Sequence, residues 1–63
     1  MNQGFKNSTG DILDIYQKPI TCEDFEGRAK LIKPVAVNQD GEEWIVEFEG
    51  EPNSYYNRQI CEH

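Results

Sequence analysis

The sequence predicts a small all-β fold, and three observations lead to this prediction. Short stretches rich in β-branched and aromatic residues alternate with segments rich in Gly, Pro and Asn. From residue 43 to 49 large apolar residues alternate with charged ones, with Ile45 as the exception at one charged position, as in a strand with one buried face. The 63 residues suffice for one domain, and a chain this short buries only about 60% of the surface that its unfolded form exposes.

The first strand is expected over residues 11–16, before Pro19. Leu13 and Ile15 share one face of this strand, and Ile12 and Tyr16 share the other, so the pattern leaves open which pair is buried. Residues 1–9 are polar apart from one Phe, and we expect them to form a flexible, disordered tail.

A long loop is expected from Pro19 to Gly27, because this segment has no apolar period. Thr21 to Asp24 has the spacing of a helical capping box with Asp at its last position, which allows a single helical turn. Phe25 lies between acidic residues, and we expect it to cover an open end of the fold.

The second strand is expected over residues 27–37, with Ala29, Leu31 and Val35 facing inward. Pro34 interrupts it, and because proline cannot donate to a ladder it indicates an edge, a bulge or a bend. A four-residue connection at 38–41 would join this strand to the alternating one, with Asp40-Gly41 supplying the reversal. The cross-strand pairs expected are Val35 with Trp44, Leu31 with Phe48, and Lys30 with Glu49.

The alternating strand has an apolar and an acidic side. Trp44, Val46 and Phe48 would point to the interior, and Glu43, Ile45, Glu47 and Glu49 to solvent. A turn at 50–54 then leads to a last strand at 55–60, in which Tyr56 and Ile60 are expected to face inward. We therefore expect a single domain over residues 10–61 and a frayed end at 62–63.

Several short sequences between residues 10 and 60 resemble small uncharacterised proteins encoded by phages and bacterial genomes. These sequences are Gly10-Asp11-Ile12, Pro19-Ile20-Thr21, Glu26-Gly27-Arg28-Ala29-Lys30-Leu31, Trp44-Ile45-Val46-Glu47-Phe48 and Arg58-Gln59-Ile60. The order of elements is similar to a Src-homology-3-like barrel of four to five short antiparallel strands. The resemblance implies a fold and no particular activity.

The charge of the chain favours a protein partner over nucleic acid. Twelve acidic and six basic residues give a net charge of −6, and the acidic residues are concentrated between residues 40 and 51. This segment is either a solubilising face or a docking surface for a basic protein, centred on Glu43, Glu47 and Glu49. Tyr16, Tyr55 and Arg58 form a second candidate surface, because Tyr and Arg often dominate interfaces, although Tyr55 and Tyr56 would serve equally well as a structural cover of the barrel rim.

The sequence fits two other functions less well. A nucleic-acid-associated module would use Arg28, Lys30, Lys33 and Arg58, but the neighbouring carboxylates offset these charges, so nucleic acid is an unlikely partner. The other alternative is a purely structural component. We therefore expect a protein-interaction module that is a monomer or weak dimer.

No motif indicates an enzyme, a metal site or a cofactor. The abundant Asp and Glu make chance carboxylate pairs easy to find, and Cys22, Cys61 and His63 match no zinc spacing. The first ten residues lack the apolar stretch of a signal peptide, and no apolar run approaches the roughly 20 residues of a membrane span. We expect a cytoplasmic protein whose two cysteines are reduced, with a disulfide as the less favoured alternative.

Overall fold

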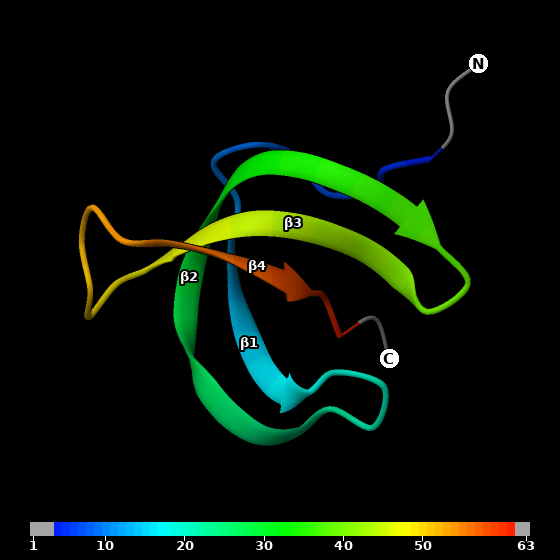
Figure 1. Cartoon of the computed structure of the whole chain (residues 1–63), viewed down its shortest axis with the longest axis horizontal. Coiled ribbons are helices and arrows are strands. Elements are labelled where there is room, and N and C mark those ends of the chain that lie inside the picture. The colour runs from blue at the N-terminus through cyan, green and yellow to red at the C-terminus, as the bar shows by residue number, and fades with distance from the viewer. Residues whose placement is uncertain (1–3, 62–63) are drawn as a thin grey trace.

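The computed structural model describes residues 4–61 and contains one antiparallel sheet of four strands. The strands are β1 (Ile12–Lys18), β2 (Glu23–Asn38), β3 (Gly41–Phe48) and β4 (Tyr55–Gln59). They lie in the sheet in chain order, so the topology is an open meander (Figure 1). The described residues form no helix, which confirms the all-β prediction.

The sheet is curled (Figure 1), and the core lies on its concave side. It consists of seven buried apolar side chains, three of them from β3: Ile15, Ala29, Leu31, Trp44, Val46, Phe48 and Ile60. Every second residue of β3 is buried, which confirms the inward direction predicted for its apolar side chains. In β1, Ile15 is fully buried and Leu13 packs against the core, so the pattern that the sequence left open is resolved in favour of this pair.

Two bulges in β2 change the pairing with β3. The hairpin turn consists of Gln39 and Asp40, so it is two residues shorter than the predicted connection at 38–41, although Val37 pairs with Glu42 as that prediction requires. The ladder then skips Ile32 and Val35, and each skipped residue shifts the register by one.

Three expected pairs are therefore wrong, although the predicted bulge near Pro34 is confirmed. Pro34 takes the place of Val35 opposite Trp44, Val46 replaces Phe48 opposite Leu31, and Glu47 replaces Glu49 opposite Lys30. Val35 is 45% exposed instead of buried.

The segment after β1 is a tight turn and not a long loop. The turn is formed by residues 19–22, and β2 begins at Glu23, so the helical turn that the sequence allows is not formed. The Thr21 hydroxyl lies 3.0 Å from a carboxylate oxygen of Glu23. Phe25 is 57% exposed and packs edge-on against Tyr16 at a centroid distance of 5.8 Å, so it does not cover an open end of the fold.

Residues 4–9 lie against the sheet, which corrects the predicted flexible tail over this range. The ring of Phe5 packs edge-on against the indole of Trp44 at 5.6 Å. The backbone N–H of Lys6 donates to the Glu42 carboxylate, and Gly10 N–H donates to the carbonyl of Leu31 at 2.7 Å. Residues 1–3 of the predicted tail and the predicted frayed end at 62–63 lie outside the described residues.

Candidate interaction surface

The convex side of the sheet carries a row of side chains that crosses all four strands. Ile12 of β1 pairs with Lys30 of β2, Lys30 pairs with Glu47 of β3, and Glu47 pairs with Tyr55 of β4. Paired residues of adjacent strands point to the same face, and this face is opposite to the one that buries Val46. The ends of the row expose apolar surface, because Ile12 is 39% exposed and Tyr55 is 54% exposed.

Of the three acidic residues of the predicted docking surface, Glu47 belongs to this row, Glu43 lies nearer the start of β3, and Glu49 follows the strand. Glu43 pairs with Ala36 on one side and Gln59 on the other, so its paired neighbours carry no charge. Glu47 faces Lys30, and its carboxylate accepts the Asn53 N–H at 2.7 Å, which fixes the β3–β4 turn. Glu49 follows β3 and is exposed.

The tyrosines divide between the two faces. Tyr16 pairs with Phe25 beyond the buried Ile15, and the alternation of β1 places it on the convex face. Tyr55 also points to the convex face, whereas Tyr56 pairs with Val46 and packs against Phe48 at 5.8 Å. The inward direction predicted for Tyr56 is therefore confirmed, although 37% of this residue remains exposed.

Arg58 is separated from the other candidate residues. It pairs with Trp44 and so belongs to the concave side, where its guanidinium donates two hydrogen bonds to the Glu26 carboxylate at 2.8 and 2.7 Å. These bonds lower the pKa of Glu26 and raise that of Arg58. The guanidinium also lies 5.2 Å from the ring centre of Tyr56. Arg58 thus joins β4 to β2.

The four basic residues of the nucleic-acid hypothesis do not form a single patch. Arg28, Lys30 and Lys33 belong to the convex face, and Arg58 belongs to the concave side. Arg28 lies 3.9 Å from Asp14, and Lys30 lies beside Glu47. A contiguous basic surface, which phosphate binding requires, is not formed by these residues.

A shallow pocket of about 240 Å³ lies along the convex row, where it contacts Ile12, Lys30 and Glu47. Its walls combine apolar side chains, a lysine and two carboxylates from Ile12, Lys30, Glu47, Phe48, Glu49 and Pro52. The volume accommodates about one amino-acid side chain, so the pocket suits a contact within a larger interface better than a cofactor.

Glu42 is a buried acidic residue that sequence reasoning did not single out. Only 2% of it is exposed, and its carboxylate accepts hydrogen bonds from the Trp44 indole at 2.8 Å, the Asn7 side chain at 3.2 Å and the Lys6 backbone. Burial raises the pKa of Glu42, but the hydrogen bonds from Trp44, Lys6 and Asn7 together lower it by more. The signal in the sequence was parity, because Glu42 shares the alternation of Trp44, Val46 and Phe48.

Cys22 and Cys61 form a disulfide, which corrects the expectation of two reduced cysteines. Their Cα atoms are 5.5 Å apart and their separation in sequence is 39 residues, so the bond links the start of β2 to the segment after β4. Among residues 4–61, no group of three or more His, Cys, Asp or Glu side chains is placed to hold a metal ion. His63 lies outside this range.

Comparisons with protein-family models, curated proteins and solved structures gave no match for this chain. Residues 4–61 include no helix with the length and apolar character that a membrane span requires.

Proposed function

We propose that this protein is a non-enzymatic interaction module that docks a basic surface of a partner protein on the convex face of its sheet. The observation that supports the proposal best is the shared face of five candidate residues from three strands and a turn. These residues are Tyr16, Glu43, Glu47, Glu49 and Tyr55. Exposed tyrosine gives such a surface amphipathic contacts. Its carboxylates, together with the net charge of −6 of the whole chain, favour a cationic partner, although Arg28, Lys30 and Lys33 share this face.

The finer fold that we propose is a Src-homology-3-like barrel, acting as a monomer or weak dimer. Two contacts support this barrel. They connect β4 and the segment after it to the first part of β2 and the residue before it, although the two strands are not neighbours in the sheet. These contacts are the Arg58–Glu26 pair and the Cys22–Cys61 disulfide. Such a disulfide fits an oxidising compartment better than the cytoplasm. We therefore propose that the module acts outside the cytoplasm.

The test measures binding of a fluorescent lysine-rich peptide by polarisation. Glu43→Lys/Glu49→Lys reverses two carboxylates of the convex face and leaves Glu47 in place, because Glu47 fixes a turn. The matched control is Asp24→Lys/Asp40→Lys, which changes the net charge equally at two exposed positions outside the convex face, because Asp24 alternates with Phe25 and Asp40 lies in the β2–β3 turn.

We expect the convex-face variant to bind the peptide about tenfold more weakly, the sum of two surface charge contacts, and the control variant to bind within threefold of wild type. Equal weakening in both variants would mean that net charge alone attracts the peptide, and the proposed surface would be wrong. Binding of a labelled oligonucleotide at physiological salt would favour the nucleic-acid alternative instead.

A further inference from the structure

Strand β4 contributes less to the core than the other strands. Six of the seven core residues belong to β1, β2 and β3, and the seventh, Ile60, follows the end of β4. All five residues of β4 itself are exposed or half-buried. Within the described part of the chain, β4 forms a backbone ladder with β3 alone. The strand therefore depends strongly on contacts outside the sheet.

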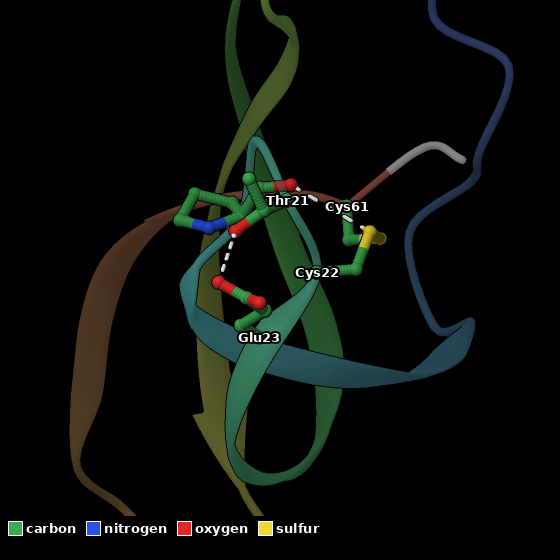
Figure 2. Close-up of a disulfide and its surroundings, with 5 residues drawn as sticks. Thr21, Cys22, Glu23 and Cys61 are labelled. Carbon is green, nitrogen blue, oxygen red and sulfur yellow. Dashed lines mark hydrogen bonds between the residues drawn. A yellow bond between two sulfur atoms is a disulfide. The ribbon is translucent and has the colours of Figure 1, made fainter.

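Two of these contacts attach the C-terminal end of β4 to the start of β2. Arg58 binds the Glu26 carboxylate through two hydrogen bonds, and Cys61 is bonded to Cys22. Figure 2 shows the disulfide between the turn that precedes β2 and the end of the chain, with Thr21 and Glu23 beside it. Cys22 and Cys61 are half-buried, so a small thiol can reach this region.

We propose that the disulfide is a redox latch that keeps β4 docked on β3. With the bond intact, β4 is tethered at both ends, by the turn at residues 49–54 and by Cys22. Detachment would then leave a closed loop with little conformational freedom to gain. After reduction, the turn is the only covalent tether of β4, and the strand detaches from its C-terminal end, while β1, β2 and β3 keep six of the seven core residues.

The reductant is a dithiol. One thiolate attacks a cystine sulfur, the bond between Cys22 and Cys61 breaks, and a mixed disulfide forms. The second thiol of the reductant then displaces the bound cysteine, so the reductant leaves as a cyclic disulfide. Two electrons and two protons are transferred, and both cysteines end as thiols.

Amide hydrogen exchange of the full chain, with and without dithiothreitol, tests this latch. The Ile60 N–H donates to the Glu42 carbonyl at 2.8 Å and reports on β4, and the Leu31 N–H donates to the Asp11 carbonyl at 2.8 Å and reports on the rest of the sheet. We expect reduction to accelerate exchange at Ile60 at least about tenfold more than at Leu31, from the loop-closure entropy that the bond removes. Cys22→Ser/Cys61→Ser should reproduce the reduced pattern without dithiothreitol.

Arg58→Met is the matched variant, because it removes the other attachment and leaves the disulfide intact. In the oxidised state we expect it to accelerate exchange at Ile60 less than reduction of the wild type does. Equal acceleration at Ile60 and Leu31 on reduction would mean that the bond stabilises the entire fold, and unchanged exchange at Ile60 would mean that β4 needs no latch. Either result would overturn the proposal.

Discussion

Glu42→Gln should destabilise the fold although it preserves the volume of the side chain. The carboxylate accepts hydrogen bonds from Trp44, Asn7 and Lys6, and a Gln amide has a single oxygen with which to replace both carboxylate oxygens. Two charge-assisted bonds become neutral, and the amide group meets the Lys6 N–H, which is also a donor. Hydrogen bonds to charged groups contribute about 1.5–3 kcal/mol and neutral ones about 0.5–1.5 kcal/mol. Relief from burying a charge offsets part of this loss, which leaves a net cost of about 2 kcal/mol.

A cost of this size is measurable in a small domain. For a domain of 60–100 residues, 1 kcal/mol shifts the melting temperature by about 4–8 °C, so Glu42→Gln should lower it by about 8–16 °C. Thermal unfolding can be followed by the fluorescence of Trp44, the single tryptophan. The matched control is Glu43→Gln, on the opposite face of the same strand, which should change stability by less than about 0.5 kcal/mol. If both variants shift the transition equally, the Glu42 carboxylate does not hold the N-terminal segment and Trp44 together as argued.

The same pair of proteins predicts a pH dependence with a definite sign. The folded-state pKa of Glu42 lies below its ordinary value of 4.5, so the carboxylate stabilises the fold fully above that value. This contribution is lost as the pH falls through the lower, folded-state pKa. The stability difference between wild type and Glu42→Gln should therefore be constant above about pH 5 and shrink below about pH 4.5. Glu26, whose pKa is also lowered, is present in both proteins and cancels. Urea denaturation across this range measures the difference, and one that grows towards acid pH would contradict the assigned sign.

Three further substitutions test the packing. Trp44→Ala removes a side chain that is 2% exposed, and a loss of about 3–5 kcal/mol should leave most of the protein unfolded at 25 °C by circular dichroism; a cooperative, little-shifted transition would contradict this. Gly27→Ala places a Cβ 3.2 Å from the Phe48 ring at a φ of +153°, so urea denaturation should show a cost of about 1–3 kcal/mol, and an unchanged midpoint would contradict it. Phe5→Ala removes an edge-on ring contact with Trp44 and should cost about 1 kcal/mol, whereas no cost would be expected if residues 4–9 were a free tail.

The buried face of a strand was predictable where apolar and charged residues alternate with a period of two. In β3, Trp44, Val46 and Phe48 occupy every second position, and two of the positions that flank them are Glu43 and Glu47. The inner face of the strand could therefore be assigned without coordinates. The register of β2 was predictable only near the turn, because composition does not show which residues a ladder skips. The bulges at Ile32 and Val35 each shift the pairing by one residue. Because two shifts of one residue restore the original alternation, Leu31 still faces inward as predicted.

The N-terminal segment and the disulfide could not be predicted for a different reason. Polar residues at 4–9 indicate a tail when judged alone, but Lys6 and Asn7 supply the donors that a buried carboxylate needs. The pairing of Cys22 with Cys61 depends on how far the sheet curls, and no local pattern reports this. The same curl brings Arg58 to Glu26 and so separates it from the convex-face residues with which sequence reasoning had grouped it.

Adjacent residues of β3 show how a short acidic chain uses carboxylates in two ways. Glu43 is half-buried on the convex face and its paired neighbours carry no charge, whereas Glu42 is buried and accepts hydrogen bonds from the chain itself. A 63-residue fold buries only about 60% of the surface that its unfolded chain exposes, so its core supplies limited stability. Three kinds of contact add to this core: the Glu42 hydrogen bonds, the Arg58–Glu26 pair and the disulfide. Each of them connects segments that are not neighbouring strands of the open meander. Polar and covalent contacts thus stabilise the concave side, whereas Glu49 and Tyr55 remain exposed.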